Sequence, residues 1–193
     1  MINVDVWAQL YLCDKDRLRI RDFFTSRFKI KSRHVIKKMH ISVYYSRRPM
    51  PGLKPITESV SVTLPSAETR FMVMAPGGEN PRPELLASEK LVGFRVHKKS
   101  SALPVIFLYR ERLLEFETEE VLGRRAPSTY KTSAFGARYY QPHMAILEPG
   151  SGVNQDLSVI GVPFREEMGD LTFDRFEIKI VQREGERPKW NPN

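Results

Sequence analysis

Two of the four histidines in the sequence stand in apolar segments typical of β-strands. His40 is followed by an apolar residue and then by Ser42, and His143 is followed by an apolar residue and then by Ala145. Because side chains alternate along a strand, each imidazole lies opposite its apolar neighbour, and the Ser42 hydroxyl shares the face of His40. Imidazole titrates near neutral pH, so two of them facing one phosphorus are suited to act as general base and general acid on a phosphodiester.

A single His-x-Ser tripeptide is a weak signal, since four histidines and many hydroxyl residues produce one by chance. Taken alone, each histidine is more simply a structural residue. The pair is more informative, because both histidines stand in the third element of the same strand–helix–strand order. The first set covers residues 4–12, 15–28 and 35–46, and the second covers 103–109, 110–122 and 139–147. His34 and His97 do not fit this pattern and are interpreted as structural or surface residues.

Alternation and turn residues predict the elements that must position these side chains. Strands are expected at residues 4–12, 35–46, 59–64, 69–74, 91–97, 103–109, 139–147 and 171–181. Helices are expected at 15–28 and 110–122. The strands at 59–64 and 69–74 are close enough in sequence to form a hairpin. Strands and helices mixed in this order, with several antiparallel connections, predict an α+β fold.

The strand at 35–46 also sorts its other side chains by face. A period of two places Met39, Ile41 and Val43 on one face and Tyr44 on the other, together with His40 and Ser42. On that face Tyr44 would stack against a base or ribose of a nucleotide. A position in the core is an equally good interpretation of this ring.

On His40 with Ser42, and on Pro142 followed by His143, the chain resembles the two-histidine (2H) phosphoesterase superfamily. Its members include bacterial RNA 2′,3′-cyclic phosphodiesterase/2′,5′-ligase-like proteins. The resemblance covers most of the chain, up to a closing strand at 171–181. It implies a two-lobed fold of mostly antiparallel sheets, with a few flanking helices and a central cleft. We therefore expect one catalytic domain over residues 1–183 and a C-terminal tail over 184–193.

Ala145 is the departure from the family pattern, because a second hydroxyl is usual there. Losing one hydrogen-bond donor to a developing negative charge typically costs on the order of 10² to 10³ in rate. Lys131 and Arg138 are candidate replacements from a basic loop at 124–138. Nearby aromatic residues that could also contact the substrate are Tyr130, Tyr139 and Tyr140. A solvated connection without function is an equally good interpretation of this loop.

Positive charge is concentrated in one segment of the sequence. The formal net charge is +8, and between Asp14 and Lys38 only Asp14, Asp16 and Asp22 oppose ten basic residues. The basic residues are Lys15, Arg17, Arg19, Arg21, Arg27, Lys29, Lys31, Arg33, Lys37 and Lys38. Such a surface attracts nucleic acid through counterion release. A solvated helix face without a specific partner is an equally good interpretation.

The cysteine content, the longest apolar run and the spacing of metal-ligand residues indicate where the protein acts and what it binds. Cys13 is the single cysteine and cannot form an internal disulfide, and the apolar run at 103–109 is too short to span a membrane. We therefore expect a cytoplasmic protein without a membrane partner. No metal-ligand spacing is visible, so no metal or cofactor is expected.

The sequence thus predicts a metal-independent phosphodiesterase that acts on a cyclic phosphate or on a 2′-linked or cyclic (oligo)nucleotide, which includes RNA. Which histidine is the base stays open at this point. The main alternative is a non-catalytic RNA- or nucleotide-binding protein that keeps the fold. A third possibility is an unrelated α+β domain in which the two histidines coincide by chance.

Overall fold

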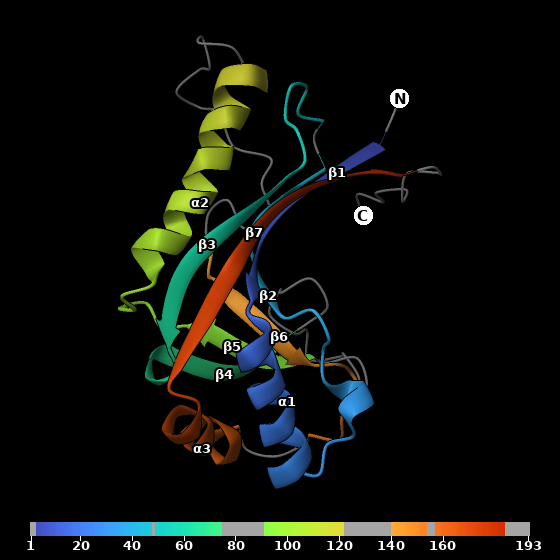
Figure 1. Cartoon of the computed structure of the whole chain (residues 1–193). Helices are drawn as coiled ribbons and strands as arrows, with labels where there is room; N and C mark the ends of the chain where they lie inside the picture. The colour runs from blue at the N-terminus through green and yellow to red at the C-terminus, as the bar shows by residue number, and fades with distance from the viewer. Residues whose placement is uncertain (1–2, 48, 75–90, 122–139, 154–156, 184–193) are drawn as a thin grey trace, which may run out of the picture.

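The computed structural model describes residues 3–47, 49–74, 91–121, 140–153 and 157–183 (Figure 1). This part of the chain is a mixed α+β structure with seven strands in one sheet and three α-helices. The strands are β1 (Asn3–Leu12), β2 (His40–Ser46), β3 (Ile56–Pro65), β4 (Thr69–Met74), β5 (Leu91–Val96), β6 (His143–Leu147) and β7 (Asp170–Arg183). The helices are α1 (Asp14–Arg27), α2 (Leu103–Phe116) and α3 (Ser158–Met168), with short helical turns at Ser32–His34, Ser66–Glu68 and Glu117–Val121.

The sheet has an approximate two-fold arrangement around its two central strands. Its order is β3-β7-β1-β2-β6-β5-β4, and every neighbouring pair is antiparallel. The units β1–α1–β2 and β5–α2–β6 repeat the same order of elements, and each unit pairs its own two strands. The mixed, antiparallel character predicted from the sequence is therefore confirmed, and the two histidine strands meet at the centre of the sheet.

The prediction of a strand at 103–109 is wrong, because these residues form the first half of α2. Pro104 stands in the first turn of this helix, where its missing N–H is not needed. Ile106, Arg110 and Leu113 are the buried residues of the helix, at helical spacing. A short apolar run fits a strand or a buried helix equally well by pattern alone. The first strand of the second unit is thus β5.

Two other sequence predictions also differ from the structure. The strands β3 and β4 do not form a hairpin; they lie at opposite edges of the sheet. The strand expected at 35–46 begins only at His40, since Ser32–His34 is a helical turn and Val35 makes a single bridge to Leu147. The helix α3 was not predicted. It carries Pro163 inside and ends at Met168, and the residue that follows, Gly169, has a φ of 59°.

One face of the sheet packs against the helices and forms the core. On β1 the buried side chains alternate as Val6, Ala8 and Leu10. Phe164 of α3 packs edge-to-face on Phe71 of β4, with ring centroids 4.9 Å apart. Burying a side chain of this size typically contributes about 1.5–3 kcal/mol. The alternate side chains of the same strands must point to the opposite face of the sheet, which is where the candidate site lies.

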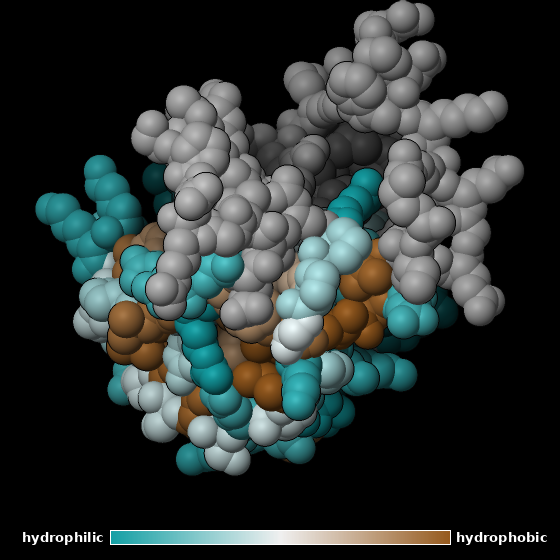
Figure 2. Space-filling model, turned by 90° about the horizontal axis from the view of Figure 1, so that it is seen from above, coloured by the Kyte–Doolittle hydropathy of each residue, from teal (hydrophilic) through white to brown (hydrophobic). Residues whose placement is uncertain are grey.

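The surface outside the core is mixed in character. In the view from above, apolar and polar atoms lie next to each other (Figure 2). The exposed large apolar side chains are Leu18, Val105, Leu108, Val159, Val162 and Val181, which are distributed over three helices and β7. Among the helices of the described ranges, none is long and apolar enough to cross a membrane.

Gly93 of β5 provides a test of the packing between β5 and β6. A Cβ at this position would lie 2.0 Å from the Met144 carbonyl oxygen and 2.8 Å from the Ala145 Cα. Both are backbone atoms of β6, so only a shift of one strand relieves the contact. We expect Gly93→Ala to lower the free energy of unfolding by about 3 kcal/mol, measured by chemical denaturation.

Gly161→Ala in α3 is the matched control. Its new Cβ would lie 3.1 Å from the flexible end of Arg165 and 3.8 Å from Phe71, which is ordinary van der Waals contact. Because alanine favours a helix over glycine by about 1 kcal/mol, this variant should be unchanged or slightly stabilised. Equal stability of the two variants would contradict the packing described for Gly93.

Candidate active site

The pairing of β2 with β6 places both histidines on one face of the sheet. Ile41 lies opposite Met144, so in an antiparallel pair Ser42 lies opposite His143 and His40 opposite Ala145. Ile41 and Met144 are fully buried on the core face, whereas His40, Ser42 and His143 are half-buried on the other face. Diagonal neighbours of this kind lie about 7–8 Å apart. The two imidazoles therefore flank one small area, with Ser42 beside both.

Both imidazoles are held in the same way. His40 Nδ1 donates to the Lys38 carbonyl oxygen at 2.9 Å, and His143 Nδ1 donates to the Gln141 carbonyl oxygen, also at 2.9 Å. A carbonyl oxygen can only accept, so the Nδ1 of each ring carries a proton. In both rings Nε2 is therefore the nitrogen that is not bonded to this backbone carbonyl.

The residue before each histidine is also hydrogen-bonded in the same way in the two units. The Leu12 amide donates to the Met39 carbonyl oxygen at 3.0 Å, and the Val96 amide donates to the Pro142 carbonyl oxygen at 2.9 Å. The approximate two-fold arrangement of the sheet thus extends to the hydrogen bonds that fix where each histidine strand begins.

A chain of side-chain hydrogen bonds determines which nitrogen of His40 is unprotonated. The Lys179 ammonium can only donate, and it donates to the Tyr11 hydroxyl. That hydroxyl therefore donates onward, to Gln9 Oε1 at 2.6 Å. The Gln9 amide is oriented by this bond, and its Nε2 donates to His40 Nε2 at 2.8 Å. His40 is consequently a neutral imidazole with its proton on Nδ1 and its lone pair on Nε2.

Burial and the charges around His40 also favour the neutral form of its imidazole. Burial contributes most to lowering the pKa of His40 below its ordinary value, since it disfavours the charged ring. The hydrogen bond to the Lys38 carbonyl opposes this effect. The positive charges of Lys179 and of protonated His143 lower the pKa further. The ring that accepts from Gln9 is thus also the ring for which protonation is disfavoured.

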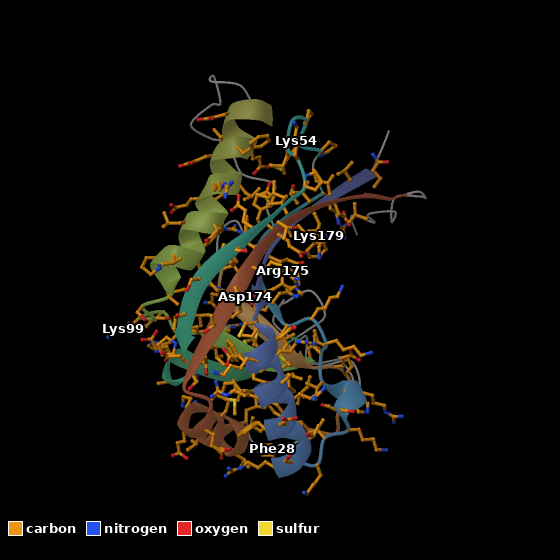
Figure 3. All side chains as sticks on the ribbon, viewed as in Figure 1. Phe28, Lys54, Lys99, Asp174, Arg175 and Lys179 are labelled. Atoms are coloured by element: carbon orange, nitrogen blue, oxygen red, sulfur yellow. The ribbon has the colours of Figure 1, made fainter. Side chains whose placement is uncertain are left out.

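Lys179 belongs to a charged group on β7 that faces the same area. Glu177 pairs with Lys179 at 2.8 Å and with Arg175 at 3.1 Å. Burial alone would lower the pKa of Lys179, but its bonds to Glu177 and Tyr11 raise it, so Lys179 stays an ammonium group. The Arg175 guanidinium lies 4.6 Å from the centre of the Tyr11 ring. Figure 3 labels Arg175 and Lys179 along this strand.

The prediction that Tyr44 shares the face of His40 is wrong. The register between β1 and β2 shifts after Ser42, so that Ala8 pairs with Tyr44. This β-bulge turns Tyr44 into the core, where it is 1% exposed, and its hydroxyl contacts Met50. Its alternative interpretation as a core aromatic fits the structure. The next residue, Tyr45, now points to the site face, where it stacks on Trp7 with ring centroids 3.9 Å apart.

Tyr140, predicted as a substrate contact, supports the bulge in β2. Its hydroxyl donates to the Ser42 carbonyl oxygen at 2.9 Å, and burial raises its pKa. Arg110 of α2 donates to the Val43 carbonyl oxygen at 2.9 Å and lies 4.2 Å from the centre of the Tyr140 ring. These side chains satisfy carbonyl groups of the bulge, so Tyr140 positions the strand that carries His40 and Ser42.

Ala145 contributes no polar group, as expected from the sequence. The proposed replacements Lys131 and Arg138 lie outside the described residues. A basic residue that the sequence analysis did not single out, Arg95 of β5, lies opposite His143 on the same face. It occupies the place in the second unit that Tyr11 occupies in the first, since Tyr11 lies opposite His40. Arg95 is therefore a further candidate to contact an anion beside His143.

The remaining histidines and hollows lie elsewhere. His34 accepts from Arg33, and His97 accepts from the Lys99 amide. Two hollows of about 470 and 300 Å³ adjoin α1, and neither is lined by His40 or His143. Within the described ranges, there is no group of three or more His, Cys, Asp or Glu side chains that could hold a metal ion.

Comparison with known proteins does not identify the family. No protein-family model matches the chain. No curated protein matches it either. Membership of the 2H superfamily therefore stays a prediction, which rests on the two histidine motifs and on the arrangement described above.

The relay from Lys179 to His40 can be tested on the isolated protein without any substrate. Lys179→Met removes a positive charge near His40 and releases the Tyr11 hydroxyl, so we expect the pKa of His40 to rise. The pKa is measured from imidazole resonances in an NMR titration. Lys99→Met, which removes an equal charge from an exposed site, should leave it unchanged. A His40 pKa that stays constant or falls in Lys179→Met would contradict the relay.

Proposed function

We propose that the chain is a metal-independent phosphodiesterase that hydrolyses a cyclic phosphate or a 2′-linked or cyclic (oligo)nucleotide. The observation that carries this proposal is the placement of His40 and His143 as diagonal neighbours on one sheet face, each held through Nδ1 by a backbone carbonyl. Two imidazoles held in this way would bind a shared ligand through Nε2 once the ligand displaces the Gln9 amide from His40. A single phosphate group is a ligand of suitable size and charge.

His40 suits the role of general base in this reaction. The ring is neutral and its lone pair is on Nε2, where it accepts from the Gln9 amide in the structure. The attacking water takes the place of that amide and gives its proton to Nε2 as its oxygen bonds to phosphorus. Lys179, Tyr11 and Gln9 act before the substrate binds, by holding His40 neutral with its lone pair on Nε2, and are positioning residues.

His143 then suits the role of general acid. In its protonated form it keeps one proton on Nδ1, bound to the Gln141 carbonyl, and gives the other from Nε2 to the leaving oxygen as the phosphorus–oxygen bond breaks. Hydrolysis of a 2′,3′-cyclic phosphate by this route opens the ring to a phosphate monoester. Ser42 lies between the two histidines and would donate to a non-bridging oxygen.

The alternative function is binding of RNA or a nucleotide without turnover. Ala145 favours it, because the second half of the site lacks the hydroxyl that Ser42 supplies to the first. The basic residues on the same face, Arg95, Arg175 and Lys179, would serve binding as well as catalysis. Measurement of turnover decides between the two functions.

The decisive assay is hydrolysis of 2′,3′-cyclic, 2′,5′-linked and 3′,5′-linked nucleotides in the presence of EDTA. We expect turnover of at least one class, with kcat lowered about 10³-fold in His40→Ala and in His143→Ala. Ser42→Ala should lower kcat by about 10² while changing KM little, since its hydroxyl acts mainly on charge formed in the transition state.

Ser59→Ala is the matched control for Ser42→Ala. Ser59 is an exposed residue of the edge strand β3, and its loss should leave kcat unchanged. Turnover that persists in both histidine variants would rule out the two-histidine mechanism. Tight nucleotide binding without turnover in the wild type would instead support the binding function.

A further inference from the structure

A groove lined by Lys37, the neighbour of the Lys38 residue whose carbonyl holds His40, has the character of an anion site. It has a volume of about 300 Å³ and lies between α1 and residues 32–37. Arg17 and Arg21 of α1 line one wall, and Arg33 and Lys37 line the other. Among the described residues, no acidic side chain contributes to this lining, which also includes Leu18, Ser32, Val35 and Ile36. We call this surface the basic groove.

The other hollow beside α1 is different. It lies between α1 and α3 and is lined by residues of both charges, including Asp22 and Glu167. Arg27 pairs directly with Glu167 there. The positive charge of that hollow is thus largely balanced, whereas the basic groove is lined by four of the ten basic residues in the segment 14–38.

The ion pairs made by the groove arginines do not cancel their charge. Arg17 pairs with Asp14 at 2.9 Å and Arg21 with Asp22 at 3.7 Å, and both carboxylates are largely exposed to solvent. Exposed pairs of this kind are worth about 0–1 kcal/mol, so a phosphate can compete for the guanidinium groups. Arginine binds phosphate well, since its planar fork donates two parallel hydrogen bonds.

The basic groove and the candidate active site are joined by a short stretch of backbone. Arg17 Nη1 donates to the Lys37 carbonyl oxygen at 3.1 Å, which connects the two walls. The next carbonyl, that of Lys38, accepts from His40 Nδ1. Two residues lie between Lys37 and His40, so their Cα atoms are about 11 Å apart at most. A strand that passes over residues 37–40 would bring a phosphate in the groove and a phosphate at His40 into one nucleotide chain.

We infer that the basic groove binds the phosphate backbone of a single RNA strand whose terminal or scissile phosphate lies between His40 and His143. The preferred substrate is then an oligonucleotide and not a mononucleotide. This preference rests on the proposed function, whereas RNA binding in the groove does not.

The test is binding of a fluorescent single-stranded RNA of roughly twelve nucleotides to the His143→Ala protein, which prevents turnover. Four phosphate contacts to a single strand predict that affinity falls about 50-fold between about 50 and 200 mM salt. Arg21→Glu and Arg33→Glu should each weaken binding about tenfold and reduce the salt dependence. Both side chains are exposed, so circular dichroism should show an intact fold.

Lys99→Glu is the matched control, because it makes the same change of charge away from α1 (Figure 3). It should change the affinity less than twofold. Equal weakening by Lys99→Glu and the groove variants would overturn the inference, since attraction would then depend on net charge alone. Groove variants that bind RNA normally would overturn it too, as would binding to vesicles of anionic lipid in place of RNA.

A kinetic comparison separates this inference from the proposed function. If the chain hydrolyses an oligonucleotide 2′,3′-cyclic phosphate, Arg21→Glu should raise KM for that substrate about tenfold and leave KM for the cyclic mononucleotide unchanged. If the wild type hydrolyses the oligonucleotide and the mononucleotide with equal kcat/KM, the inference about the basic groove is overturned and the proposed function is unaffected. If the groove variants lose RNA binding and the wild type shows no hydrolysis, the groove inference stands and the proposed function is overturned.

Discussion

The pairing of β2 with β6 is the interaction on which the candidate site depends, because it joins the two units of the chain at their histidines. With Ile41 opposite Met144, both apolar side chains enter the core and both imidazoles point to the other face. A slip of one residue would exchange the faces and bury an imidazole among apolar side chains. The pairing of β2 with β6 is short. It is stabilised by the longer pairing of β1 with β2 on one side and by β5 on the other, which packs closely on β6 at Gly93.

The two halves of the site are alike in backbone and unlike in side chains. Each imidazole is fixed through Nδ1 to a carbonyl two residues earlier in the sequence. Beyond that shared anchoring, His40 faces Tyr11 and Gln9, whereas His143 faces Arg95 and Ser42. Two chemically equal imidazoles would have no reason to take different roles. The relay that ends at Lys179 makes them unequal, and it does so by orienting one amide.

Much of this arrangement could be predicted from the local sequence, and the remainder could not for identifiable reasons. The alternation around His40 and His143 correctly placed Ile41 and Met144 in the core. Tyr44 was misplaced because a β-bulge depends on the neighbouring strand and leaves no mark in a period of two. The segment 103–109 was misassigned because an apolar run fits a strand or a helix; the proline at its start was the available signal.

The supporting residues of the site were missed because they come from strands far apart in the sequence. Gln9 and Tyr11 lie on β1 and Lys179 on β7, and only the sheet order brings them together. A signal was present, since polar residues alternate with apolar ones on β1. That alternation shows which side chains share a face, but the sheet topology decides that the shared face is that of His40.

The central claim is that both imidazoles bind one phosphate group, and the most direct measurement is an NMR titration of ¹⁵N-labelled imidazoles with a nucleotide 2′-phosphate. The account predicts that the Nε2 signals of His40 and His143 shift together, with the same Kd, and that free His40 shows a protonated Nδ1. Shifts with different Kd values, or a shift of one imidazole alone, would contradict it.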